Sequence, residues 1–291
     1  MDKIIAEPSG ADDDSPFGAD ETLAENGFYW RQSEGVKVLV CCHLDAAGFA
    51  NGFSTRLGGV SPFPENSLNL AGFDEDAAEN IYENRRRFMR VFDGELKLAT
   101  VWQVHGDTVK VVRDGSDVNE AMTRADAMVS NLRGVFLGVK TADCVPVLIG
   151  DTRSGAFAAV HAGWRGTAQS IVVNAIEKMR KAFSSEPSDL IAAIGPAAAC
   201  EAYEIGQDVI DAFRDGFTEW ERYFTPTREG HALVDLPRAN RDQLIGAGIL
   251  GENIHAAPFC TVTRTDLFFS YRIEKRKYGK TGRLLSVIGR I

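Results

Sequence analysis

The sequence predicts a single α/β domain, a layered sandwich in which helices cover a mixed β-sheet. Short apolar runs typical of buried strands alternate along the chain with amphipathic stretches of helical period. The alternation lacks the strict strand–helix–strand repeat of an all-parallel sheet, so we expect strands of both directions. No internal repeat or linker is visible, and 291 residues with 44% hydrophobic content can bury a sizeable core.

The charge of the chain is concentrated at its N-terminus. Residues 1–25 contain eight acidic residues and one lysine, out of a net charge of −9 for the whole chain. This composition predicts a disordered acidic tail over residues 1–25 and a single folded domain over residues 26–291. The remainder is nearly neutral and has no long basic stripe, which argues against nucleic acid as a main partner.

Two further features of the composition concern location. No stretch approaches the roughly 20 apolar residues that span a bilayer, and the N-terminus lacks the apolar core of a signal peptide, so we expect no membrane partner and a cytoplasmic location. The five cysteines are an odd number without a Cys-x-x-Cys spacing. We therefore expect reduced thiols rather than a disulfide framework or an all-cysteine zinc site.

The first part of the chain is expected to contain short strands and one helix. The expected strands cover residues 28–31, 36–42, 98–104, 108–112 and 126–129. Residues 98–104 and 108–112 would pair with each other, broken at His105. The helix covers residues 76–92, with Asp76 as its cap and the three arginines at 85–87 facing solvent.

A short strand is expected to begin at Phe53. It ends in a loop rich in glycine, proline and asparagine, and this loop continues to Leu70. Such a loop could bring Arg56, Ser61 and Asn69 to one small ligand. The same composition also suits a surface loop in which these residues only set the turn geometry.

The stretch from residue 134 to residue 167 is the centre of the prediction. Residues 135–139, 145–149 and 156–160 are apolar runs bounded by turn residues and are expected as buried strands. Thr167 can cap a helix over residues 168–183, whose apolar side chains share one face. Beyond it we expect strands at 190–194, 254–258 and 284–288, and helices at 207–213 and 237–249.

Three residues with metal-binding side chains lie at the ends of these runs. Cys144 lies at a strand edge, His161 ends a strand that enters a Gly-rich turn before a helix, and His105 follows a further apolar run. Imidazole and thiolate suit Zn²⁺ or copper. The long spacings form no local motif, and such residues more often have separate structural roles. If they converge, they leave the fourth tetrahedral position open, as in catalytic zinc sites.

Charged residues near these three have two interpretations each. Asp143 could be a general base or could orient a histidine, or it could simply cap a turn; Asp126 has the same alternatives. Arg165 lies in a Gly-flanked turn at a helix N-terminus, where amides favour anions. With Arg56 and Arg272 it could hold a phosphate, although each arginine alone more often forms a surface ion pair.

The motifs also match a known family. They occur in family order as STRLGGVS, NSLNL, ENRRRF, WQVHGD, ADAMVSN, TADCVPVLI, AVHAGWRGT, IGPAAACEAYEIG, DLPRANRDQL, FFSYR and TGR. From about residue 50 onward the chain resembles the laccase-domain family, also called multicopper polyphenol oxidase or purine nucleoside phosphorylase, whose bacterial members are described as peptidoglycan editing factors. The chain departs from the family pattern at residues 69–74 and at Arg272-Ile273, in two loops that we expect to contact substrate.

The resemblance implies a fold, an activity and a set of site residues. The fold is a layered sandwich similar to a bacterial cysteine-histidine deamidase toxin, so residues 26–291 would be one catalytic, laccase-like domain. The activity is phosphorolysis of adenosine, inosine and methylthioadenosine, with adenosine deamination, at a zinc site that could also take copper. The metal ligands and catalytic residues would be His105, Cys144 and His161, with Asp143 as a further catalytic residue. The residues expected to bind nucleoside or phosphate are Arg56, Asn69, Gln103, Arg165 and Arg272. We expect a monomer or homodimer.

Other functions remain open at this point. A true multicopper oxidase needs on the order of ten histidines, many in His-x-His pairs, whereas this chain has five histidines and no such pair. Cys144 could instead be a thiolate nucleophile with a histidine base that cleaves an amide, as peptidoglycan-precursor editing would require. A non-enzymatic zinc-stabilised binding module would need a fourth ligand, for which the sequence offers no obvious candidate.

Overall fold

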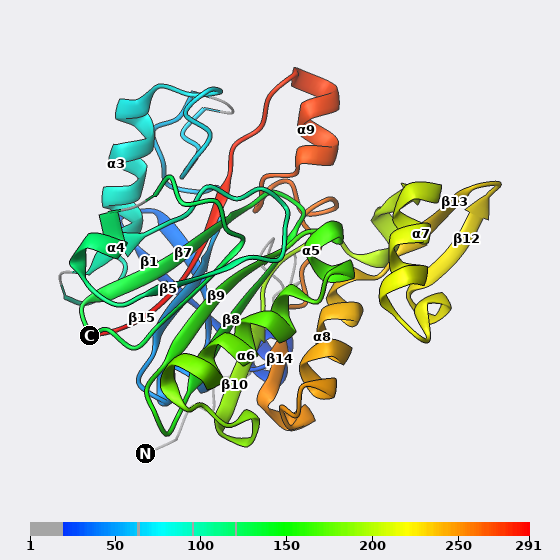
Figure 1. Cartoon of the computed structure of the whole chain (residues 1–291). Coiled ribbons are helices and arrows are strands. Elements are labelled where there is room, and N and C mark those ends of the chain that lie inside the picture. Colours follow the sequence, from blue (N-terminus) through cyan, green and yellow to red (C-terminus); the bar gives the residue numbers. More distant parts are fainter. Residues whose placement is uncertain (1–19, 63–64, 95, 120) are drawn as a thin grey trace, which may run out of the picture.

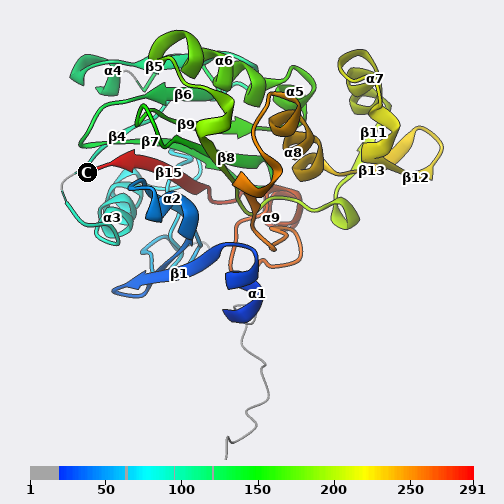
Figure 2. The ribbon, with the colours of Figure 1, turned by 90° about the horizontal axis from the view of Figure 1, so that it is seen from below.

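The computed structural model describes residues 20–62, 65–94, 96–119 and 121–291. Two six-stranded sheets lie face to face between layers of helices (Figures 1 and 2). This architecture confirms the predicted layered α/β sandwich, but it contains two large mixed sheets where the sequence predicts one. Among the described residues, no helix combines the length and the apolar composition needed to cross a bilayer.

We call the two large sheets sheet I and sheet II. Sheet I has the order β1 (Phe28–Ser33), β2 (Val36–Cys41), β3 (Ala50–Ser54), β15 (Leu284–Arg290), β7 (Val135–Thr141), β4 (Lys97–Ala99). Sheet II has the order β14 (Ile254–Ala256), β10 (Leu190–Ile194), β8 (Val145–Asp151), β9 (Phe157–Ala162), β6 (Ala127–Ser130), β5 (Val109–Val112). Each sheet is mixed, because β4 runs parallel to β7 in sheet I, and β5–β6 and β10–β14 are parallel pairs in sheet II.

Three hydrophobic cores hold the layers together. One lies between the two sheets, one lies between sheet II and helices α6 (Ile171–Phe183) and α8 (Leu236–Gly246), and one lies between sheet I and α3 (Ala78–Met89). Every residue of β8 and β9 is buried. Strands buried on both faces are mostly apolar, which is why the sequences of β8 and β9 are nearly continuous hydrophobic runs, with Asp151 and His161 as the charged or polar exceptions.

A small lobe projects from the end of sheet II (Figure 1). It contains the three-stranded sheet β11 (Glu204–Gly206), β13 (His231–Val234), β12 (Phe224–Arg228) and helix α7 (Gln207–Gly216). Only α7 is predicted from the sequence, because the strands are short and β12 is mostly exposed. The other α-helices of the described residues that have no prediction are α1 (Asp20–Glu25), α2 (Cys42–Ala46), α4 (Gly115–Asn119), α5 (Trp164–Ala168) and α9 (Tyr271–Tyr278).

Several element predictions need correction. The expected pair over residues 98–112 is wrong, because β4 lies in sheet I and β5 in sheet II, so the segment between them crosses from one sheet to the other. Thr167 does not cap the long helix. It lies inside a short helix, α5 (Trp164–Ala168), and α6 begins after Ser170, which adopts a φ of 60°. Two apolar runs predict strands but do not identify the neighbour of each strand.

The N-terminal prediction and the arginine run also differ from expectation. Most of the segment predicted as disordered lies outside the described residues, but its last six residues form α1 and bury Leu23. Of the three arginines expected to face solvent, Arg85 is partly buried, and its Nε donates a hydrogen bond to the Leu70 carbonyl over 2.9 Å. Asp76 lies one residue before the N-cap of α3 and accepts from the amide of Ala77.

Candidate metal and active site

The structure brings His105, Cys144 and His161 together. The ligand atoms of the three side chains lie within 4.8 Å of one another. We call these three residues the His-Cys-His cluster. Each comes from a different part of the sandwich: His105 from the crossing between β4 and β5, Cys144 from the turn between β7 and β8, and His161 from β9. Since β8 and β9 are antiparallel neighbours that pair Val145 with Ala162, the start of one strand lies beside the end of the other.

The buried carboxylate of Asp126 orients two members of the cluster. Its Oδ1 lies 2.8 Å from His161 Nδ1 and accepts a hydrogen bond from the His105 amide over 2.9 Å. The amides of Val104 and Gly106 donate to Oδ2. Holding Nδ1 by a carboxylate leaves Nε2 as the nitrogen available to a metal, the usual arrangement for a metal-bound histidine. Asp126 therefore has the orienting role that the sequence left open between two aspartates.

Asp143 has other partners. Its carboxylate accepts hydrogen bonds from Thr261 Oγ1 at 2.7 Å, from Ser270 Oγ at 3.1 Å and from the Arg272 amide at 2.8 Å. It adopts a φ of 85°, in the left-handed region that non-glycine residues rarely occupy. Burial raises the pKa of its carboxyl, against the lowering effect of these hydrogen bonds. The contacts place Asp143 as the anchor of the turn that presents Cys144, and they do not join it to a histidine.

The charges of the cluster favour a thiolate. Burial alone would raise the pKa of Cys144, but the neighbouring His161 and His105 outweigh it and lower the pKa to about 6. Burial would lower the pKa of His161, but Cys144 and Asp126 raise it to about 9. Without a metal, the pair is thus a thiolate beside an imidazolium. A metal cation would replace the imidazolium proton and keep the thiolate, so the donor set fits Zn²⁺ or copper.

Gly163 packs so closely against the cluster that a side chain would not fit there. A Cβ on Gly163 would lie 3.1 Å from His105 Cδ2 and 3.2 Å from Cys144 Sγ. His105 itself has a φ of 59°, so its backbone is strained where its amide reaches Asp126. Close packing and strain at one place are typical of functional sites.

Comparison with known proteins agrees with this architecture. A family model described as multi-copper polyphenol oxidoreductase laccase matches residues 50–291. The chain belongs to this laccase-domain family. It is 36% identical over 255 residues to the purine nucleoside phosphorylase YfiH of Escherichia coli, which covers 87% of this chain and 98% of that protein. It is 38% identical over 239 residues to a purine nucleoside phosphorylase of Deinococcus radiodurans, at 81% and 87% coverage.

Solved structures of relatives share the fold. YlmD from Geobacillus stearothermophilus superposes with a TM-score of 0.82 at 32% identity, over 91% of this chain and 98% of that one. A Bacillus licheniformis protein titled YfiH gives a TM-score of 0.83 at 30% identity, over 91% and 100%. The resemblance inferred from the motifs is thus confirmed at the level of family and fold.

In this laccase-domain protein, two residues expected to bind ligand form internal contacts. Arg56 makes a buried ion pair with Glu274 of α9 at 2.7 Å, and its guanidinium lies 4.5 Å from the centroid of the Phe269 ring. Asn69 donates to Asp76 and accepts from the amide of Arg283. Both residues therefore join the long loop to the C-terminal part of the chain.

The other three residues expected to bind nucleoside or phosphate are Gln103, Arg165 and Arg272. Gln103 bonds the backbone of Lys140 in β7, with its amide group donating over 2.7 Å and its oxygen accepting over 2.8 Å. Arg272 donates to the Glu204 carbonyl, and its guanidinium lies 4.6 Å from the centroid of the Tyr203 ring. Arg165 is exposed and lies over the Trp164 ring at 4.0 Å.

Tyr203 lies near the cluster, although it is not among the residues that the sequence predicts to bind ligand. Burial raises the pKa of its phenol to about 12, and the charge of Cys144 adds to the effect. The phenol therefore lies within electrostatic range of Cys144, and it stays protonated at neutral pH. It belongs to the motif IGPAAACEAYEIG, but the motif does not single out this side chain, which follows a short 3₁₀ turn in an irregular segment.

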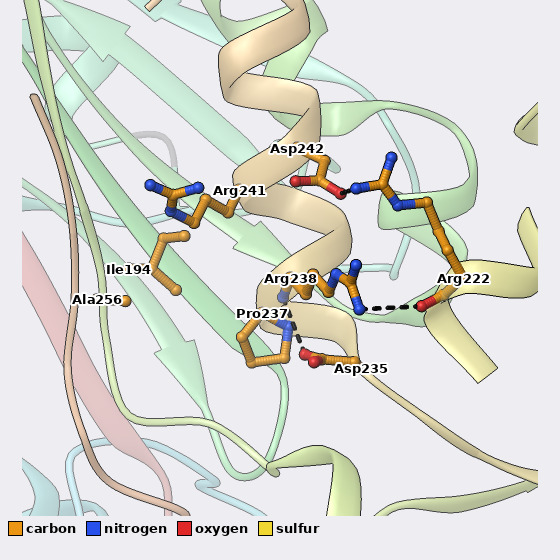
Figure 3. Close-up of a pocket in the computed structure, with 8 residues that line it drawn as sticks. All are labelled: Ile194, Arg222, Asp235, Pro237, Arg238, Arg241, Asp242 and Ala256. Carbon is orange, nitrogen blue, oxygen red and sulfur yellow. Dashed lines mark hydrogen bonds and ion pairs between the residues drawn. The ribbon is translucent and has the colours of Figure 1, made fainter. Parts of the chain in front are cut away.

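Two cavities in the described part of the laccase domain contain no residue of the cluster. The first, of about 450 Å³, is lined by Ile194, Arg222, Asp235, Pro237, Arg238, Arg241, Asp242 and Ala256 (Figure 3). Most of its charges are satisfied internally, since Arg222 pairs with Asp242 at 3.2 Å and Asp235 caps α8. The second, of about 510 Å³, shares Ile194, Asp235, Pro237 and Ala256 with it.

Proposed function

We propose that the protein is a purine nucleoside phosphorylase that acts on adenosine, inosine and methylthioadenosine and also deaminates adenosine. The observation that carries the proposal is the His-Cys-His cluster oriented by Asp126, in a chain whose relatives of 36–38% identity are named purine nucleoside phosphorylases. We propose zinc as the metal, held by His105, Cys144 and His161, with copper as the other metal that this donor set accepts.

The residues of the chain suit this chemistry. When bound, the metal supplies a Lewis acid that can activate water or polarise the purine base. Asp126 fixes the orientation of His161, and the glycine at 163 leaves room beside the cluster. In phosphorolysis a phosphate oxygen forms a bond to the ribose C1′, the bond to the purine nitrogen breaks, and the purine must receive a proton. The protonated phenol of Tyr203 is our candidate hydrogen-bond donor to the departing base.

The cysteines bear on the compartment in which the protein acts. All five cysteines are free thiols, as expected of a protein in a reducing compartment. We propose that the protein acts in the cytoplasm, on nucleoside and phosphate, as a monomer or homodimer.

The Cys144→Ala variant tests the proposal. Wild-type protein should contain about one zinc per chain by elemental analysis, and should convert adenosine to adenine only when phosphate is present; inosine formation reports the deaminase. Removal of the thiolate should reduce both the metal content and adenine release to background. Both activities intact in the variant would contradict the proposal.

One observation favours a second function. A thiol whose pKa is about 6, beside a histidine held by a carboxylate, is the arrangement of a cysteine nucleophile with its base. The protein would then cleave an amide, as in editing of a peptidoglycan precursor. Elemental analysis separates the two, because a zinc-bound thiolate is a poor free nucleophile. Metal-free protein that ignores adenosine and is alkylated rapidly at Cys144 would favour the amide hydrolase.

A further inference from the structure

Two basic side chains, those of Arg85 and Lys140, belong to elements that pack together on the side of sheet I that α3 covers. Side chains alternate along a strand, and Phe136 of β7 packs in the core shared with α3, so Lys140 points to the same side. The residue that pairs with Lys140 in β15, Leu285, belongs to this core too. On α3, Arg85 precedes the core residue Phe88 by one helical turn.

The Lys140 side chain is tied to the segment that carries the cluster. Its Nζ donates to the Val101 carbonyl over 2.6 Å. The Gln103 side chain accepts from the backbone amide of Lys140 and donates to its carbonyl. Val101 and Gln103 lie on the crossing between the sheets, which continues directly to His105. The ammonium group and the His-Cys-His cluster are therefore positioned by one short stretch of chain.

The two positive charges have no counter-ion in the described part of the chain. The ion pairs there include neither Arg85 nor Lys140. Both side chains are partly buried. Burial lowers the pKa of Lys140, and the charge of Arg85 adds to this effect, while Asp126 opposes it; the result is a pKa of about 8. Asp126 is already bonded to His161 and to three backbone amides.

We propose that Arg85 and Lys140 form the subsite that binds inorganic phosphate, the second substrate of the proposed reaction. The Nε of Arg85 is fixed by the Leu70 carbonyl, and a guanidinium presents paired N–H groups that match phosphate oxygens, while an ammonium adds a compact point charge. An anion between two partly buried cations removes their repulsion. The identity of the anion as co-substrate rests on the proposed function; the existence of an anion site does not.

The test compares Lys140→Met with two controls. Lys140→Arg keeps the charge, and Arg86→Gln removes a neighbouring charge on α3 that is exposed and paired with Glu83. Binding of inorganic phosphate to the metal-loaded protein is measured by calorimetry without nucleoside, and the KM values for phosphate and adenosine are measured separately. We expect Lys140→Met to weaken phosphate binding by roughly 10- to 100-fold, the range for a lost charge-assisted hydrogen bond. Lys140→Arg should restore most of it, and Arg86→Gln should change nothing.

The outcomes for the subsite and for the function are distinct. A raised KM for phosphate with an unchanged KM for adenosine supports both. Phosphate binding that depends on Lys140, in a protein without adenosine turnover, supports the anion site and contradicts the phosphorylase. Three results would overturn the subsite, whatever the turnover shows. The first is an unchanged phosphate affinity in Lys140→Met, and the second is an equally weak affinity in Lys140→Met and Lys140→Arg. The third is no binding to the wild type at millimolar phosphate.

Discussion

At the scale of single residues, Gly163 offers the sharpest test of the geometry. It is the N-cap of α5 with φ −70° and ψ 173°, a conformation open to alanine, so Gly163→Ala causes no backbone strain. The new methyl group would press on His105 Cδ2 and Cys144 Sγ at 3.1 and 3.2 Å. We expect metal affinity to fall about 10- to 100-fold, as when groups that orient ligands are lost, while the free energy of unfolding of the metal-free protein changes by less than about 1 kcal/mol.

A matched control is Gly206→Ala. Gly206 also caps a helix, α7, with an extended backbone, and its added Cβ would meet only the end of the Asp208 side chain at 3.2 Å. For both variants, the metal content is measured by elemental analysis and the free energy of unfolding by urea titration. Full metal content in Gly163→Ala would mean that the cluster does not close as tightly as the structure shows.

Residue chemistry also explains which site residues the sequence could identify. His105, Cys144 and His161 are recognisable because imidazole and thiolate donors beside small residues suggest a metal site. The choice between Asp126 and Asp143 is not readable from the sequence, since each aspartate adjoins an expected strand. The fold decides it, because Asp126 directly precedes β6 and its carboxylate lies beside His161 of β9, while Asp143 accepts from Thr261 and Ser270.

At the scale of elements, the ion pair between Arg56 and Glu274 joins the end of β3 to α9. The two side chains are 7% and 4% exposed and lie 2.7 Å apart. Removing one partner of a buried pair leaves an uncompensated charge. We therefore expect Glu274→Gln to lower the free energy of unfolding by about 3–5 kcal/mol, measured from urea titrations.

The exposed pair of Glu219 and Arg222, within one 3₁₀ turn region, is the control for that variant. With side chains 74% and 41% exposed, it is screened by water. Glu219→Gln should cost less than about 1 kcal/mol. Equal effects of the two variants would show that the α9 contact is not a stability determinant.

The elements also show where sequence reasoning succeeds and where it stops. Strands such as β8 and β9 are predictable because they are buried on both faces and their sequences are apolar apart from Asp151 and His161. The partners of strands are not predictable, as β4 and β5 show, because pairing depends on contacts between distant segments. The ion pair of Arg56 could not be predicted either, because its partner Glu274 is far away in the sequence and lies in the unpredicted helix α9.

At the scale of the whole molecule, the His-Cys-His cluster lies where the two sheets are joined. The chain passes from sheet I to sheet II between β4 and β5, which carries His105, and again between β7 and β8, which carries Cys144. His161 belongs to β9, a central strand of sheet II. A metal held by all three would tie both crossings to that strand, so metal binding should stabilise the fold as a whole and not only the site.

Chelation tests this coupling. A ligand that binds only the folded state stabilises it by about 4 kcal/mol when its concentration is a thousand times its Kd, which for a chain of this size corresponds to a Tm shift of roughly 7 °C. We expect a chelator to lower the Tm of the wild type by that order, with elemental analysis confirming that the metal has left. The Cys144→Ala variant, already without metal, should not respond. A wild-type Tm that stays constant after confirmed loss of the metal would mean that the crossings are held by their own hydrogen bonds, chiefly those of Asp126 to the three backbone amides and to His161.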